Sequence, residues 1–130
     1  MTMLSKRVIF ISKSTLSQNL LEMIIKTIPR KVDFIPYRDM AAVMRTYFPK
    51  TVQLVIMDYN AMPKEDAEGV FQEVFSKKNL KQSKKVMIYS REAAIDHNKM
   101  KKLGVDYIYA KPFLPNEFIE LVSKHLGIKV

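Results

Sequence analysis

The sequence of 130 residues contains no cysteine, only three glycines and no long hydrophobic run. Without cysteine it forms no disulfide scaffold, cysteine metal site or thiol nucleophile, which fits a reducing compartment. No apolar stretch approaches the roughly 18 residues of a membrane span. The start, MTMLSKRVIF, lacks the apolar core of a signal peptide. We therefore expect a cytoplasmic protein whose residues 1–130 form one domain, either alone or as the N-terminal part of a longer protein.

The balance of charge is strongly basic, with 22 Lys and Arg against 13 Asp and Glu and a formal net charge of +9. Such a surface attracts acidic partners, and nucleic acid is one candidate. The densest cluster is KKNLKQSKK, residues 77–85. No aromatic residue interleaves with these lysines for base stacking, so we interpret the cluster as a solvated loop. Any binding of nucleic acid would be electrostatic and salt-dependent, and we do not expect it of this domain alone.

Short apolar segments predict five β-strands, at residues 8–11, 31–37, 52–57, 85–90 and 106–110. The central segments are apolar at consecutive positions rather than at alternating ones. That pattern is typical of a parallel sheet that is buried on both faces.

The segments between these strands predict helices over residues 15–28, 39–48, 64–76, 91–103 and 115–126. The buried face of the first is expected to contain Leu16, Leu20, Met23, Ile24 and Ile28. That of the second is expected to contain Met40, Val43, Met44 and Tyr47. The last carries Phe118, Ile119, Leu121, Val122 and Leu126. Regular alternation of strand and helix predicts a doubly wound α/β fold with helices on both faces of the sheet.

Polar residues stand at the carboxyl ends of the predicted strands, which is where such folds bind ligands. The first strand ends at Ser12 and Lys13, the third at Asp58, the fourth at Ser90 and the fifth at Lys111. We expect this carboxylate, these two ammonium groups and these two hydroxyls to converge at one edge of the sheet.

This pattern resembles the receiver domains of response regulators, the CheY-like phospho-acceptor modules of bacterial two-component signalling. In LVIMDYNAMP, Asp58 stands where the family has its phosphorylated aspartate. Ser90 ends VMIYS at the family's Ser or Thr position, and GVDYIYAKPF matches its Gly and Lys-Pro through Gly104 and Lys111. The resemblance covers nearly the whole chain. It implies a flavodoxin-like sheet of five parallel strands in the order 2-1-3-4-5, with five helices.

The acidic pair that holds Mg²⁺ in receiver domains is missing, because its positions are Ser12 and Lys13. Magnesium prefers one or two carboxylates together with phosphate oxygens, and only Asp58 is left. At about 4 Å and an effective dielectric near 20, a pair of unit charges is worth roughly 4 kcal/mol, so a lysine held there would oppose a divalent cation by about twice that.

Two further positions depart from the family. The segment from Asp58 to Pro63 is one residue longer than usual, which predicts a rebuilt loop over the site. The switch position, usually Tyr or Phe, is Ile108, and tyrosines stand at positions 107 and 109 instead. Isoleucine has no polar group, so it cannot alternate between a buried and a solvent-exposed orientation as tyrosine can.

One hypothesis is that Lys13 replaces the metal and pairs with Asp58 alongside Lys111. The alternative is that Lys13 points into solvent, since its long stem permits both. We expect an atypical receiver, not an enzyme, that works through protein contacts without phosphorylation, Mg²⁺ or another cofactor. The alternative function is a conventional receiver that a histidine kinase phosphorylates on Asp58, with Mg²⁺ bound.

In the family, the fourth helix, fifth strand and fifth helix commonly dock partners or a second copy. The resemblance therefore implies a protein partner, an output domain or a homodimer contact within residues 91–126, and no membrane partner. The candidate residues of this surface are Lys99, Lys101, Lys102, Tyr107, Tyr109 and Phe118.

Two other readings are weaker. The loop SKSTLS, residues 12–17, has hydroxyls that could hold the phosphate of a flavodoxin-type cofactor at a helix N-terminus. It has no glycine to let the backbone approach closely, and this reading leaves the Lys-Pro ending unexplained.

His97 and His125 are far apart without neighbouring ligands, so we interpret them as structural rather than metal-binding.

Overall fold

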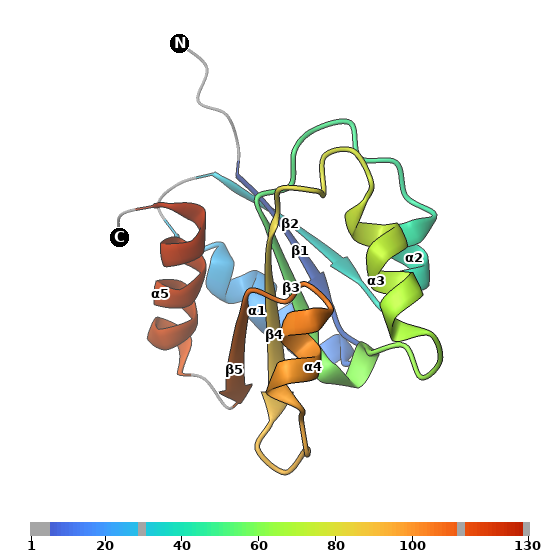
Figure 1. The fold of residues 1–130 in the computed structure, drawn as a ribbon. Helices are drawn as coiled ribbons and strands as arrows, with labels where there is room; N and C mark the ends of the chain where they lie inside the picture. Colours follow the sequence, from blue (N-terminus) through green and yellow to red (C-terminus); the bar gives the residue numbers. More distant parts are fainter. Residues whose placement is uncertain (1–5, 29–30, 112–113, 129–130) are drawn as a thin grey trace.

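The computed structural model describes residues 6–28, 31–111 and 114–128. Its strands are β1 (Lys6–Ile11), β2 (Val32–Tyr37), β3 (Leu54–Asp58), β4 (Lys84–Ser90) and β5 (Tyr107–Lys111). All neighbouring strands pair in parallel, in the order β2-β1-β3-β4-β5 (Figure 1). The predicted fold class and strand order are therefore confirmed.

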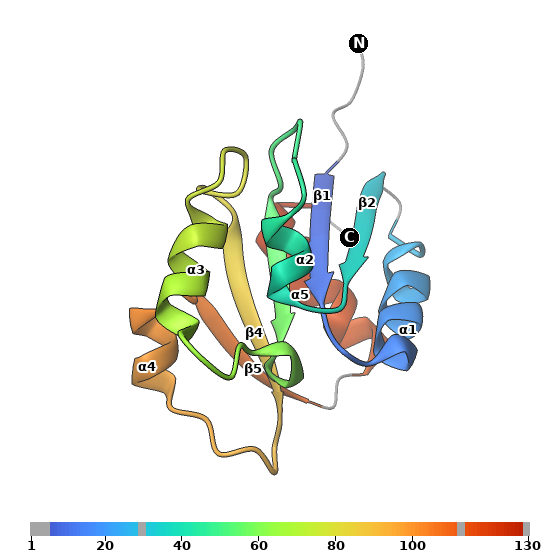
Figure 2. The same ribbon diagram turned by 90° about the vertical axis from the view of Figure 1, so that its right-hand side faces the viewer.

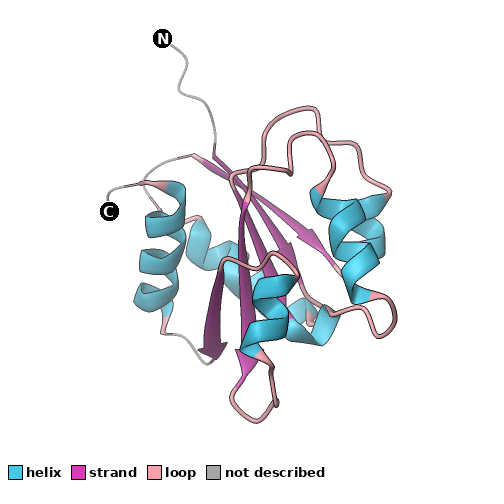
Figure 3. Ribbon diagram, viewed as in Figure 1, coloured by secondary structure: helices cyan, strands magenta, loops and turns pink. Residues whose placement is uncertain are grey.

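Helices cover both faces of this sheet. They are α1 (Thr15–Ile25), α2 (Met40–Met44), α3 (Ala67–Phe75), α4 (His97–Lys102) and α5 (Pro115–Leu126), with a short 3-10 helix η1 (Tyr59–Ala61) after β3. Helices α1 and α5 lie on one face and α2, α3 and α4 on the other (Figures 2 and 3). None of the helices among the described residues has both the length and the apolar character needed to cross a membrane.

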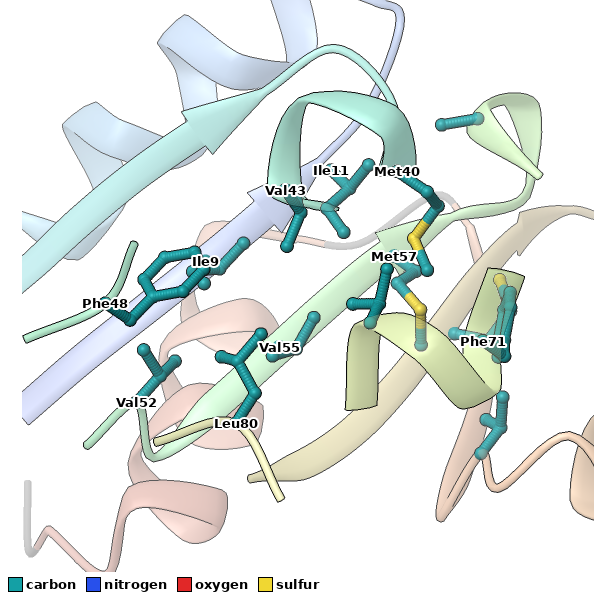
Figure 4. Close-up of a cluster of buried hydrophobic side chains, with 14 of the residues drawn as sticks. Ile9, Ile11, Met40, Val43, Phe48, Val52, Val55, Met57, Phe71 and Leu80 are labelled. Carbon is teal, nitrogen blue, oxygen red and sulfur yellow. The ribbon is translucent and has the colours of Figure 1, made fainter. Parts of the chain in front are cut away.

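The core is divided by the sheet into two apolar clusters. On β1, Ile9 and Ile11 face the cluster under α2, α3 and α4, which Figure 4 shows in close-up. Val8 and Phe10 face the cluster under α1 and α5. Every residue of β3 is buried, Asp58 included. The consecutive apolar residues of the central strands are thus explained by burial on both faces.

Helix starts are set by polar caps, and this explains where predicted and observed boundaries differ. Asp66 and Asp96 accept backbone N–H bonds from Gly69 and Lys99, so α3 and α4 begin later than the apolar pattern predicted. Helix α2 ends at Met44 instead of continuing to residue 48.

The predicted buried face of the first helix is wrong at three of its five residues, whereas Ile28 is buried and Ile24 packs partly buried against the core, as predicted. Leu16, Leu20 and Met23 are 78%, 52% and 68% exposed, whereas Leu21 and Ile25 are buried, as is Ile28 beyond the helix. The helix is apolar around most of its circumference, so periodicity alone did not identify the face that meets the sheet. Tyr47 was also predicted to be buried and is 82% exposed. It lies beyond the end of α2, in the loop that leads to β3.

The orientation of α1 can be tested with neighbouring leucines. Leu21→Ala removes a buried side chain and is expected to lower the free energy of unfolding by about 2–4 kcal/mol. Leu20→Ala is the matched control, expected to change it by less than about 0.5 kcal/mol because Leu20 is on the surface. Urea denaturation followed by circular dichroism measures both. Equal losses would contradict this orientation.

Candidate functional site

The buried carboxylate of Asp58 lies at the carboxyl edge of the sheet and is only 2% exposed. Its Oδ2 accepts hydrogen bonds from Lys111 Nζ at 2.9 Å and from Ser12 Oγ at 3.1 Å. Its Oδ1 accepts the backbone N–H of Asn60 at 3.3 Å. Three groups from three different segments therefore satisfy one carboxylate, and Lys111 compensates its charge.

Ser12 is completely buried at the end of β1, and its hydroxyl uses its full bonding capacity. It donates to Asp58 and accepts from the backbone N–H of Ser14 at 3.1 Å and from Asn60 Nδ2 at 3.4 Å. A hydroxyl offers one donor and two acceptor lone pairs, and all three are occupied.

Asn60 joins the site from η1 and was missed by the sequence reasoning. Besides its bonds to Asp58 and Ser12, its Oδ1 accepts the backbone N–H of Lys13 at 3.1 Å. The available signal was its place two residues after the strand-ending Asp58, because an Asp side chain commonly bonds the backbone two residues on.

Gln18 on α1 was also missed, and it fixes the loop after β1. Its Nε2 donates to the carbonyl oxygens of Ser12 at 2.9 Å and of Tyr37 at 3.0 Å. Arg38 donates to the carbonyl of Lys13 at 3.0 Å. The ends of β1 and β2 are thereby tied to the first turns of α1.

The main chain of Lys13 is held on both sides, while its side chain is exposed. Within residues 6–28, 31–111 and 114–128, Lys111 is the only ion-pair partner of Asp58. The hypothesis of a Lys13–Asp58 pair therefore does not match the structure, and the alternative, a solvent-directed lysine, does. Lys13 borders a shallow hollow of about 290 Å³ together with Met62 and Lys64.

Solved structures similar to this chain include several receiver domains. A CheY-like receiver protein from Methanospirillum hungatei is 17% identical, with a TM-score of 0.71 over 95% of each chain. The Mn²⁺-bound response regulator Rcp1 is 22% identical, with a TM-score of 0.71 over 96% of this chain and 97% of its own. The signal receiver domain of a LuxO repressor protein from Vibrio parahaemolyticus is 18% identical, with a TM-score of 0.74 over 95% of this chain and 92% of its own. The fold is that of a receiver domain.

No model of a protein family matches the sequence, and no curated protein sequence does. The likeness to receiver domains is therefore one of fold, and this chain's own residues decide what its receiver fold does.

Ser90, at the receiver's hydroxyl position, does not join Asp58. Along the sheet Asp58 is in register with Ile88, whereas Ser90 is in register with Lys111 and so lies further along β4. The exposed Ser90 hydroxyl donates instead to the carboxylate of Glu92. This hydrogen bond lowers the pKa of Glu92. Of the five strand-end residues, only Ser12, Asp58 and Lys111 bond to one another.

Ile108, at the receiver's switch position, is half-buried and packs on the core beneath α4. Its neighbours in β5 face the opposite side of the sheet, as the alternation of a strand requires. There Tyr109 OH lies 3.0 Å from His125 Nε2, and the Tyr107 and His125 ring centres are 4.3 Å apart.

The predicted partner surface is only partly exposed. Lys99, Lys101 and Lys102 of α4 are exposed, and Tyr107 is 39% exposed. Tyr109 is half-buried. Phe118 of α5 is completely buried, so its assignment to this surface is wrong. Its apolar side chain fills the cluster between the sheet and α1.

His125 is 3% exposed, and no hydrogen-bond partner for its Nδ1 occurs in the described part of the chain. Burial lowers the pKa of His125, Lys84 and Lys124 lower it further, and Asp106 opposes them. His97 is exposed and packs edge-on against Tyr89. The described residues contain no cluster of three His, Asp or Glu side chains able to hold a metal ion.

Lys111→Met would leave the Asp58 charge buried without compensation. Breaking a buried pair costs about 3–5 kcal/mol, and because Lys111 is 29% exposed we expect a loss of about 2 kcal/mol in the free energy of unfolding. Adding Asp58→Asn should recover stability. Lys26→Met, which breaks the exposed pair with Glu22, is the control and should cost less than about 0.5 kcal/mol. Urea denaturation of the native protein, of the single variants Lys111→Met, Asp58→Asn and Lys26→Met, and of the double variant measures these changes. A loss in the double variant equal to the sum of the Lys111→Met and Asp58→Asn losses would contradict the coupling.

The lowered pKa of His125 predicts a loss of stability on acidification. As the pH falls below about 6.5, this histidine takes up a proton in the unfolded chain while burial opposes its protonation in the folded chain. The free energy of unfolding therefore decreases by up to about 1.4 kcal/mol per pH unit. His125→Phe should flatten the curve between pH 7 and about 5, whereas the control His97→Gln should leave it unchanged. Denaturation midpoints across this range measure the effect, and an unchanged slope in His125→Phe would exclude His125 as its source.

Proposed function

We propose that this chain is a signal-transduction module of the receiver type that acts by protein contact, without Mg²⁺ and without phosphorylation of Asp58. The observation that carries this proposal is that both oxygens of the Asp58 carboxylate accept hydrogen bonds from within the protein, from Lys111, Ser12 and the Asn60 N–H.

We call Asp58 and the three residues bonded to it, Lys111, Ser12 and Asn60, the lock. These three residues supply what a buried carboxylate needs. A charge taken out of water costs several kcal/mol unless it is paired and hydrogen-bonded (roughly 3–5 kcal/mol when a partner is lost). Lys111 supplies the opposite charge, while Ser12 and Asn60 supply the remaining hydrogen bonds. The site is thus electrostatically balanced by its own side chains, which supports a single resting state.

The oxygen donors at this edge do not fit a magnesium ion. Magnesium requires near-octahedral oxygen ligands, usually with one or two carboxylates. Here Asp58 is the only carboxylate in the lock, and the Ser12 hydroxyl is committed to Asp58 as a donor. The side-chain oxygen of Asn60 already accepts the Lys13 N–H. A cation would have to displace Lys111 and break these bonds together.

Phosphoryl transfer depends mainly on positioning and on neutralising the charge of the transferred group. Among the described residues Lys111 is the one cation bonded to Asp58, and its charge already neutralises the carboxylate. Ser90, which would contact a phosphoryl group in a conventional receiver, is turned to Glu92. These features favour a module that signals by its shape and surface.

The surface best suited to a partner is the exposed lysine row of α4. Lys99, Lys101 and Lys102 lie in the last turn of α4, and none of them forms an ion pair with any described residue. An acidic partner or output domain fits better than a second copy, because a two-fold contact would bring like charges together.

The experiment is an amide NMR titration with Mg²⁺, followed by beryllium fluoride as an acyl-phosphate mimic. In the native protein we expect no shifts at Ser12, Asp58 or Lys111. The variant Ser12→Asp/Lys13→Asp restores the acidic pair, so we expect shifts at Asp58 and Lys111 that saturate with Mg²⁺.

The matched control for this titration is Lys64→Asp, a charge reversal beside the same hollow that does not touch the lock. It should be as silent as the native protein. Saturable shifts at Asp58 and Lys111 in the native protein would instead establish a conventional, phosphorylatable receiver.

A further inference from the structure

The edge of the sheet opposite Asp58, where the parallel strands begin, is strongly basic. We call it the amino edge. Its exposed or half-buried cations are Lys6, Arg7, Lys31, Lys50, Lys78, Lys81 and Lys84. The acids nearby are Asp33 and Asp106. Ion pairs among the described residues involve none of these cations. Much of the protein's net positive charge is thus concentrated at one end of the molecule.

The two loops that lead into β3 and β4 form the centre of the amino edge (Figures 1 and 2). Asn79, held at a φ of 74°, ties them together. Its Nδ2 donates to the carbonyl of Phe48 at 2.6 Å, and its own carbonyl accepts the N–H of Val52 at 2.9 Å. Lys77 Nζ donates to the carbonyl of Thr46 at 3.0 Å. The loops therefore present their cations from a fixed platform, which reduces the ordering cost of binding.

Two neighbouring hollows run across this platform. One, of about 580 Å³, is lined by Arg7, Lys31 and Lys50 among others. The second, of about 240 Å³, is lined by Lys78 and Lys81 among others. Thr51 and Asn79 line both hollows, so the two adjoin at these residues with cations on either side, and we call them together the groove.

An exposed aromatic residue precedes Pro49, Lys50 and Thr51 in the loop that lines the groove. Tyr47 is 82% exposed, and the carbonyls of its two neighbours accept hydrogen bonds from Lys77 and Asn79. The lysine cluster has no aromatic residue of its own in sequence, but the fold brings Tyr47 to it. A basic groove with an exposed aromatic ring is the combination that single-stranded nucleic acid uses, since phosphates need cations and bases need a ring to stack on. An acidic peptide would need only the cations.

We propose that the amino edge binds single-stranded nucleic acid, with phosphates along the groove and a base stacked on Tyr47. This binding goes beyond the proposed function and uses the opposite end of the sheet. It also replaces the expectation that this domain alone does not bind nucleic acid. The described residues place no helix or strand for reading base sequence at this edge, so the binding is independent of sequence and falls steeply with salt.

The test measures fluorescence anisotropy of a labelled oligothymidine with the full chain at several salt concentrations. Lys50→Glu/Lys78→Glu/Lys81→Glu should abolish most binding and reduce the slope of log K against log salt by about two, at roughly 0.7 per lost phosphate contact. The control Lys64→Glu/Arg91→Glu/Lys99→Glu changes the net charge equally, away from this edge, and should keep the slope. Equal losses in both triple variants would overturn the proposal in favour of net charge alone.

Stacking is tested separately at Tyr47. Tyr47→Ala should weaken binding about tenfold and Tyr47→Phe should preserve it, because a ring suffices for stacking. A polyglutamate peptide is the competitor of equal charge and should bind without any dependence on Tyr47. If polyglutamate binds as tightly as the oligonucleotide, or if Tyr47→Ala changes nothing, the amino edge is a surface for acidic proteins and the proposal fails. Neither result affects the Mg²⁺ titration, because that experiment reports on Ser12, Asp58 and Lys111 at the carboxyl edge of the sheet.

Discussion

The ion pair between Lys111 and Asp58 is the interaction on which the carboxyl edge of this sheet depends. β3 is buried along its whole length, so a charge at its end must be compensated within the protein. Lys111 reaches it from β5, two strands away, and Ser12 reaches it from β1 on the other side. Asn60 in η1 donates its backbone N–H to the other oxygen of the same carboxylate. One carboxylate thus fixes the relative positions of four segments of the chain.

A single change of side-chain chemistry at Ser12 alters what this geometry needs. An acid at that position would place a second negative charge beside Asp58 and would call for an external cation. A hydroxyl can donate to Asp58 and accept from its neighbours at the same time, so these bonds are made within the protein. Ser12 contacts Asp58 through its hydrogen-bonding capacity, whereas the positively charged side chain of Lys13 is exposed.

The apolar segments allowed the five strands and the strand-end position of Asp58 to be predicted, because burial on both faces leaves a strong apolar signal. The order of the strands was predicted from the resemblance to receiver domains and is confirmed. Periodicity failed on α1, where Leu16, Leu20 and Met23 form one apolar face and Leu21 and Ile25 form another, and only the sheet selects between them. Phe118 shows the reverse case, since its place in an apolar helical stripe was a better guide than its position in the family. Asn60 and Gln18 escaped prediction because their roles depend on loop geometry that brings distant backbone groups together.

The strand order 2-1-3-4-5 has a consequence for the way the chain assembles during synthesis. After β1, β2 and β3 have paired, β4 and β5 can be added one after the other at the same side of the sheet, in the order in which they are made. Asp58 is therefore made well before Lys111, which arrives with the last strand. A nascent chain that ends before β5 lacks the counter-charge of Asp58, so burying that carboxylate is unfavourable until Lys111 has been added.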